Sequence, residues 1–200
     1  MKLFAMEDGN TTLSPDEQAE LIPNLATREE LNEWERQNIL EAYAWALDER
    51  KIGRRNAVSD LLSEPYVREL HRRMFDQTWK WAGRYRVTEK NIGIPFHQIQ
   101  ESLATLLGNA RYWLKNQTFA PDEIAVRFHH RLVFIHPFSN GNGRHARLMA
   151  DVLARRQGMP VFTWGGAELI NAGDFRRSYI EALQAADQNE IGPLLKFARS

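Results

Sequence analysis

The chain has 200 residues, 43% of them hydrophobic, which suits one compact domain or one domain with a small extension. Its 26 basic and 26 acidic side chains cancel, so no global field attracts nucleic acid or an anionic membrane, and the lack of cysteine excludes disulfides and thiolate chemistry. The sequence has neither the apolar run of a signal peptide nor a stretch of about 18 apolar residues that could span a membrane. We therefore expect a cytoplasmic protein without direct contacts to membranes or nucleic acid.

Helical signals begin after an N-terminal arm. Residues 1–13 carry little pattern, and Ser14 is typical of the N-cap of a short helix. Thr27 and Glu30 form the pattern of a capping box. Apolar residues then recur at helical spacing to about Arg50, which predicts a long helix.

Five further helices are expected in the rest of the chain. Apolar periodicity and capping signals place them at Ser63–Thr78, Pro95–Leu114, Pro121–Phe134, Asn142–Arg156 and Asp174–Ala186. The sequence contains no repeat and no linker long enough to divide a domain. We expect a mainly α-helical bundle, with residues 1–55 as the arm and helical extension and residues 56–200 as the main domain.

The segment Gly83–Ile94 is the exception to this helical pattern. Tyr85, Val87 and Ile92 favour strands, and the intervening sequence Glu89-Lys90-Asn91 favours a turn. We predict a small β-hairpin lying on the helical body. The alternative is an ordinary surface loop.

The residues most suited to chemistry lie in a loop that leads into the fourth of these helices. The run Asn140-Gly141-Asn142-Gly143 tolerates unusual backbone angles and leaves room for a ligand against the main chain. Backbone N–H groups at the start of a helix favour an anion, and Arg144 and Arg147 are spaced to face the same one. A phosphate chain suits this arrangement, although the lysine and Ser/Thr of a Walker loop are missing.

His136 stands at the front of this loop, directly before Pro137. An imidazole beside a phosphate cradle can accept the proton of a hydroxyl that attacks phosphorus. Taken alone, a histidine bonded to the backbone is an equally good interpretation, and a glycine-rich loop alone most often caps a helix. Their combination at this spacing favours phosphate chemistry.

The string HPFSNGNGRHAR resembles the signature of the Fic family: His-Pro-Phe, a variable residue, an acid, Gly-Asn-Gly-Arg, two variable residues and Arg. It departs only at Asn140, where the family usually has Asp or Glu. WAGRYR, at 81–86, is similar to the family's run into its flap, and YIEAL, at 179–183, is similar to its C-terminal helix. The stretch 21–42 resembles a subgroup named mobile mystery protein B, found beside a helix-turn-helix protein on mobile elements.

The resemblance implies a Fic domain over residues 56–200, in which Gly83–Ile94 is a flap that docks the target protein. It implies transfer of AMP from ATP to a Ser, Thr or Tyr hydroxyl of that target, with Mg²⁺ and with His136 as general base. The implied nucleotide-binding residues are Phe138, Gly141, Asn142, Gly143, Arg144, Arg147 and Tyr179. The implied target-docking residues are Arg86, Val87, Asn91, Ile92, Gly93 and Ile94. Phe138 is expected to pack inward, and Tyr179 to stack near the adenine or to belong to the core.

Two positions bear on how active such a site is. Asn140 is the implied metal ligand, and its neutral amide should hold Mg²⁺ less tightly than a carboxylate. Many family members also carry an inhibitory helix whose glutamate pairs with the second arginine of the signature. WERQN, at 34–38, loosely resembles that helix, so we expect Glu35 to pair with Arg147; the alternative is a solvated acid on a charged helix.

Two other functions stay open. The first is a nucleotide-binding regulatory or toxin-like module of a mobile element with weak transfer, or transfer of another phosphate-containing group, because Asn140 departs from the signature. The second is a DNA-associated protein that works with a helix-turn-helix partner encoded nearby. The lack of a recognition helix and of excess basic charge argues against direct DNA binding.

Overall fold

The computed structural model of the chain describes residues 11–48, 60–166 and 172–200. Across these three stretches the chain forms helices and no β-strand, so the expected mainly α-helical fold is confirmed. The predicted β-hairpin at Gly83–Ile94 is wrong. The elements in chain order are α1 (Pro15–Ala19), α2 (Arg28–Ala46), α5 (Glu64–Phe75), η1 (Phe96–Gln98), α6 (Ile99–Asn116), α7 (Pro121–Ile135), α8 (Asn142–Arg156), α9 (Ala172–Asp187) and α10 (Gly192–Arg199).

The two N-terminal helices begin at capping boxes. Ser14 Oγ accepts a hydrogen bond from the Glu17 N–H at 3.3 Å, and Thr27 Oγ1 accepts one from the Glu30 N–H at 3.2 Å. Each glutamate in turn accepts from the backbone N–H of its cap. The starts of both helices therefore follow from local side-chain chemistry, as the sequence predicted.

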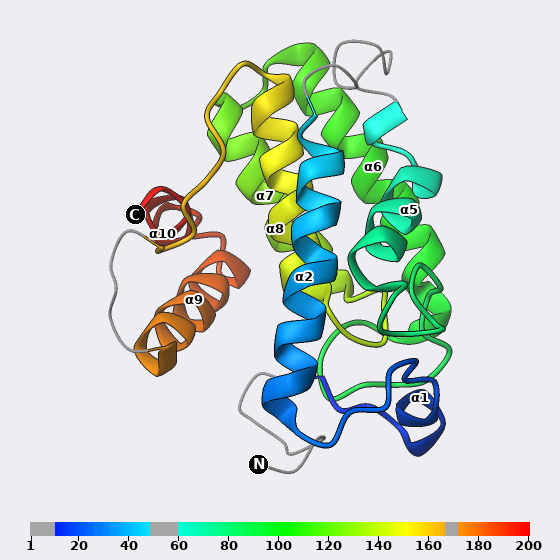
Figure 1. Cartoon of the computed structure of the whole chain (residues 1–200). Helices are drawn as coiled ribbons and strands as arrows, with labels where there is room; N and C mark the ends of the chain where they lie inside the picture. Colours follow the sequence, from blue (N-terminus) through cyan, green and yellow to red (C-terminus); the bar gives the residue numbers. More distant parts are fainter. Residues whose placement is uncertain (1–10, 49–59, 167–171) are drawn as a thin grey trace.

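The helices pack around α7 and α8, which lie side by side (Figure 1). α6 packs on α7, α2 packs along α5, and α9 pairs with α10 beside α7. α10 was not predicted from the sequence, although Pro193 in its first turn is a helix-start signal. None of the helices in the described stretches is long and apolar enough to cross a membrane.

Asp151 on α8 is a buried carboxylate that joins three parts of the chain. It accepts hydrogen bonds from the Tyr43 hydroxyl on α2 at 3.0 Å, from the Phe162 N–H at 3.0 Å and from Trp164 Nε1 at 3.1 Å. Burial raises the pKa of Asp151. Because one side chain satisfies three donors, it fixes α2 and the segment after α8 on the central helix.

Replacing Asp151 with alanine should lower the free energy of unfolding by about 3 kcal/mol, because each buried donor left unpaired costs about 1–3 kcal/mol. Urea denaturation followed by circular dichroism measures this change. Glu101→Ala, which removes an exposed acid from α6, is the control and should change the free energy by less than about 0.5 kcal/mol. Equal effects of the two substitutions would contradict the bracing role of Asp151.

Candidate active site

A tight loop between α7 and α8 carries most of the predicted site. α7 ends at Ile135, and its C-cap, His136, is left-handed with a φ of 55° and a ψ of 59°. α8 follows Gly141, whose φ is 77°. Asn142 closes the loop: its Oδ1 accepts from the Phe138 N–H at 2.9 Å, and its Nδ2 donates to the Phe138 carbonyl at 2.8 Å. Both polar atoms of the Asn142 side chain thus bond inside the loop. Asn142 also lines the cavity described below, and its contact with a nucleotide stays a prediction.

The loop rests on a buried pair of rings. Phe138 is fully buried and stacks on His71, with the ring centroids 3.7 Å apart. Phe138 therefore packs inward as expected, and its part in nucleotide binding stays a prediction. His71 Nδ1 accepts from the Gly83 N–H at 3.0 Å, and His71 Nε2 donates to the Asn140 carbonyl at 3.0 Å.

His71 was not among the predicted site residues. It lies on the buried side of α5 with Val67, Leu70 and Met74, and this helical spacing was the signal that could have found it. Burial lowers the pKa of His71 well below its usual range, so the ring is neutral and uses one nitrogen as acceptor and the other as donor. His71 thereby joins the start of the flap segment to the loop before α8.

A cavity of about 680 Å³ opens beside this loop. The predicted residues that line it are Glu35, Ile92, Gly93, His136, Asn140, Gly141, Asn142, Gly143, Arg144, Arg147 and Tyr179. The cavity is also lined by residues to which the sequence assigned no role, among them Thr11, Arg28, Asn32 and Arg176. Four arginines against two acids, Glu35 and Asp187, make the lining positive, which suits a polyanion such as a phosphate chain.

His136 faces this cavity with a neutral ring. Its Nε2 lies 2.8 Å from Thr11 Oγ1, and only 4% of the residue is exposed. Burial and the nearby charge of Arg86 lower the pKa of His136 to about 4, so at pH 7 one ring nitrogen can accept a proton. Gly93, with a φ of 100°, packs so closely that a Cβ built on it would lie 2.5 Å from His136 Cβ.

Glu35 reaches the cavity from α2 and is 3% exposed. Its Oε2 forms an ion pair with Arg144 Nη1 at 2.6 Å, and its Oε1 accepts from Trp79 Nε1 at 2.8 Å. The predicted partner, Arg147, was therefore wrong. Trp79 fixes the carboxylate beside the first turn of α8, where it meets Arg144, one turn before Arg147.

Arg147 instead lies against α9. Its guanidinium sits over the Tyr179 ring, 5.5 Å from the centroid, and the Tyr179 hydroxyl is 3.0 Å from His129 Nε2. Burial raises the pKa of Tyr179 to about 12, so the hydroxyl stays protonated. Tyr179 borders the cavity while tying α9 to α7, and its stacking on an adenine stays a prediction.

A sequence profile of the Fic/DOC family matches residues 61–154, from α5 through most of α8. The chain carries a Fic/DOC family domain. The glycine-rich loop, the two arginines and His136 all lie within the matched residues.

Curated relatives share this domain but are longer. The chain is 33% identical over 133 residues to the protein adenylyltransferase Fic of Nematostella vectensis, covering 64% of this chain and 30% of that protein. It is 29% identical over 143 residues to that of Aedes aegypti, covering 70% of this chain and 27% of that protein. The match thus takes in less than a third of each relative's length.

Solved structures show the same fold. The TM-score to Fic-1 from Caenorhabditis elegans is 0.61 at 26% identity, covering 92% of this chain and 51% of that one. The TM-score to the BepC protein of Bartonella tribocorum, solved with bound AMPPNP, is 0.65 at 19% identity, covering 93% and 97%. The helical architecture is therefore that of a Fic domain.

The flap segment of this Fic domain is an irregular loop held by Arg86. The Arg86 guanidinium donates to the carbonyls of His136 at 2.8 Å, of Thr88 at 3.0 Å and of Ile94. Tyr85 contributes one isolated bridge to Phe138. The Arg86 side chain thus supplies hydrogen bonds across the flap in place of the backbone ladder of a hairpin. The Arg86 side chain is buried, so it holds the flap in place, and a role for its main chain in docking a target stays a prediction.

Other flap residues differ in where they lie. Val87 is 77% exposed and Ile92 is 38% exposed, so both stay candidates for docking. Asn91 Oδ1 accepts from the Thr12 N–H at 3.2 Å, which places it beside the N-terminal arm. Ile94 packs partly against the core. Only Ile92 and Gly93 of the predicted docking residues reach the cavity itself.

Asn140 is the residue of this Fic domain that could hold a metal ion. It lines the cavity, but its Oδ1 also accepts from the Gly141 N–H at 2.6 Å. In the described part of the chain no three His, Cys, Asp or Glu side chains gather as a metal site. Mg²⁺ in nucleotide sites takes most of its ligands from phosphates and water, so a single neutral oxygen fits a weakly held ion.

Proposed function

We propose that this chain is a protein adenylyltransferase that moves AMP from ATP to a Ser, Thr or Tyr hydroxyl of a target protein. The observation that carries the proposal is the neutral His136 ring, which borders an arginine-lined cavity and lies 2.8 Å from a hydroxyl oxygen. Relatives named protein adenylyltransferase match 64% and 70% of this chain. The target protein and its docking on Val87 and Ile92 belong to this proposal.

The residues divide the reaction between them. Arg144 and Arg147 bind the β- and γ-phosphates, and the main chain of Gly141 and Gly143 borders the triphosphate at the start of α8. The target hydroxyl oxygen attacks the α-phosphorus while its proton passes to His136 Nε2. The bond from the α-phosphorus to the bridging oxygen breaks, and pyrophosphate leaves.

Magnesium offsets phosphate charge when it is bound. We propose that Asn140 holds the ion through its amide oxygen. This oxygen also accepts a hydrogen bond from the Gly141 N–H, so the ion and the N–H compete for it. Asn140→Asp should therefore lower the Mg²⁺ concentration needed for half-maximal transfer, because a carboxylate adds a negative charge and a second oxygen. Titrating Mg²⁺ at fixed ATP measures this, with Asn116→Asp on α6 as the control. Identical titrations for Asn140→Asp and the wild type would argue against a metal contact at Asn140.

Glu35 acts as an inhibitory carboxylate in this proposal, since it takes up Arg144 before a γ-phosphate arrives. Glu35→Gln should raise transfer severalfold and lower the KM for ATP, because it removes the charge yet keeps an acceptor for Trp79. Initial rates over a range of ATP concentrations measure both effects. Glu33→Gln, on the exposed side of the same helix, should leave them unchanged. Unaltered kinetics of Glu35→Gln would remove the inhibitory role.

The decisive test follows the label of the nucleotide. Lysate proteins incubated with the purified chain should take up label from α-phosphate-labelled ATP and none from γ-labelled ATP. The His136→Ala variant, used as the negative control, should transfer almost no label. Parallel incubations with α-labelled UTP and GTP show which nucleotide is preferred. Label from the γ-phosphate would indicate transfer of another phosphate-containing group. Nucleotide binding without transfer would favour the regulatory or toxin-like module and defeat the proposal.

Several finer features of the proposal rest on the sequence. They are cytoplasmic residence, a helix-turn-helix partner encoded on the same mobile element, and a boundary near residue 55 between the helical extension and the Fic domain. Pull-down with the tagged chain from its native cells tests the partner. Limited proteolysis tests the boundary.

A further inference from the structure

The described part of the N-terminal arm begins at Thr11, beside His136 in the cavity. Thr11 lines the cavity, and its Oγ1 lies 2.8 Å from His136 Nε2. This is the distance at which a general base takes a hydroxyl proton. On the proposed function, a hydroxyl at this position belongs to the group that accepts AMP.

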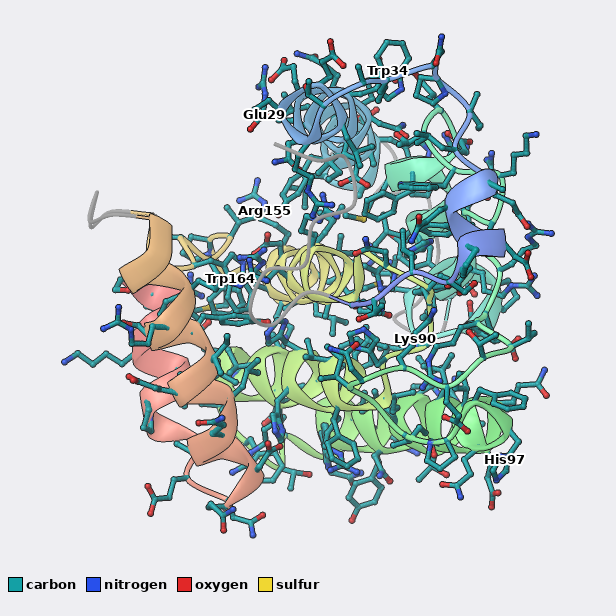
Figure 2. All side chains as sticks on the ribbon, turned by 90° about the horizontal axis from the view of Figure 1, so that it is seen from below. Glu29, Trp34, Lys90, His97, Arg155 and Trp164 are labelled. Carbon is teal, nitrogen blue, oxygen red and sulfur yellow. The ribbon has the colours of Figure 1, made fainter. Side chains whose placement is uncertain are left out.

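The arm is held in this place by the flap. Lys90, labelled in Figure 2, donates from Nζ to the Thr12 carbonyl at 3.1 Å, and Asn91 Oδ1 accepts from the Thr12 N–H at 3.2 Å. Both main-chain groups of Thr12 are therefore bound by the segment expected to bind a target. The neighbouring Thr11 is thereby presented to His136.

Two further contacts anchor the arm behind Thr12. Leu13 is buried, and its carbonyl accepts from Gln18 Nε2 at 2.9 Å. Glu17 in α1 forms an ion pair with Lys90, whose side chain is 2% exposed. The arm is thus fastened to α1 and to the flap at once, which preorganises its hydroxyl at the base.

We propose that Thr11 is a self-modification site, at which the chain transfers AMP to its own hydroxyl. The inference rests on the proposed adenylyltransferase function. Thr11 Oγ forms a bond to the α-phosphorus of ATP, and its proton moves to His136 Nε2. The bond between the α-phosphorus and the bridging oxygen breaks, pyrophosphate leaves, and Thr11 carries AMP as a phosphodiester.

The test compares two adjacent threonines. Purified wild type, Thr11→Val, Thr11→Ser and Thr12→Val are incubated with α-labelled ATP and Mg²⁺, alone and in the Glu35→Gln background, and AMP is mapped by peptide mass spectrometry. We expect AMP on residue 11 in the wild type, in Thr11→Ser and in Thr12→Val. Thr11→Val removes the accepting hydroxyl and should lose at least about 90% of the self-label. Other hydroxyls of the chain lack a positioned general base, which is worth about 100-fold or more in rate. AMP confined to other residues overturns the inference.

Concentration dependence shows whether the transfer is intramolecular. The tethered arm predicts a first-order rate that stays constant over a hundredfold range of protein concentration, whereas a rate proportional to concentration contradicts a transfer within one chain. In a mixture, active Thr11→Val should leave Thr11 of His136→Ala unlabelled. Labelling of the inactive chain in that mixture counts against the proposal.

A lysate assay separates this inference from the function on which it rests. If Thr11→Val labels lysate proteins in a His136-dependent manner while the wild type never carries AMP on Thr11, the self-modification fails and the adenylyltransferase function stands. If neither self-label nor lysate label forms, both fail. Lysate labelling by Thr11→Val also shows that this variant is folded.

Discussion

His136→Ala should reduce AMP transfer by about 100- to 10,000-fold, the usual contribution of a positioned general base. The ring is neutral, 4% exposed and within hydrogen-bond distance of a hydroxyl, which is the placement that a general base requires. Quantifying α-label on substrate proteins gives the ratio. His97→Ala, which removes an exposed histidine before α6 (Figure 2), is the matched control and should keep full activity. Equal activity of the two variants would defeat the assignment of the base.

The pH profile of the wild type adds a second readout for His136. Its pKa is lowered to about 4, and the base must be unprotonated to act. The value of kcat/KM should therefore stay level from about pH 8 to pH 5 and fall as the pH approaches 4. Circular dichroism at each pH confirms that the protein is folded. A fall centred near the ordinary histidine pKa of about 6.5 would contradict the burial of this ring.

Gly93→Ala should lower transfer at least about 100-fold, because a displacement of about 1 Å at a reacting group has this effect. The added Cβ would lie 2.5 Å from His136 Cβ and 3.1 Å from Arg86 Nη2. The flap must then withdraw or His136 must move, and both outcomes spoil the geometry of the base. Assays of AMP transfer at saturating ATP measure the loss.

Gly158→Ala is the matched control for this substitution. Gly158 has a φ of 76°, so alanine suffers a comparable backbone penalty, but a Cβ there meets nothing within 4 Å. It should lower stability while leaving kcat unchanged. If both alanine variants lose activity alike, backbone strain and not the contact with His136 explains the effect.

The local features of the fold could be predicted from the sequence. Capping boxes, prolines and apolar spacing lie within a few residues of the helix ends, so α1, α2 and α8 begin where Ser14, Thr27 and Gly141 indicate. The loop from His136 to Arg147 was also predictable, because its residues are contiguous and a helix start fixes their relative places.

Features that depend on tertiary contacts could not be predicted in this way. Which arginine meets Glu35 depends on the distant Trp79, which holds the carboxylate. The β-branched and aromatic residues of the flap favoured strands, yet the buried Arg86 replaced the ladder. The arrival of Thr11 at His136 joins residues 125 positions apart, and no local pattern records it.

Four of the buried imidazoles make this fold sensitive to acid. Burial lowers the pKa of His129 and His145 to about 3 and that of His136 to about 4, and that of His71 lies well below its usual range. In the unfolded chain each imidazole is protonated below about pH 6.5, whereas in the native protein it stays neutral at that pH. Below about pH 6.5 the unfolded state therefore binds more protons than the native state, and acid favours unfolding. Their contribution to the free energy of unfolding is therefore complete above about pH 6.5 and is lost progressively as the pH falls toward 4. The burial that keeps His136 uncharged at neutral pH thus also limits the acidity that the protein survives.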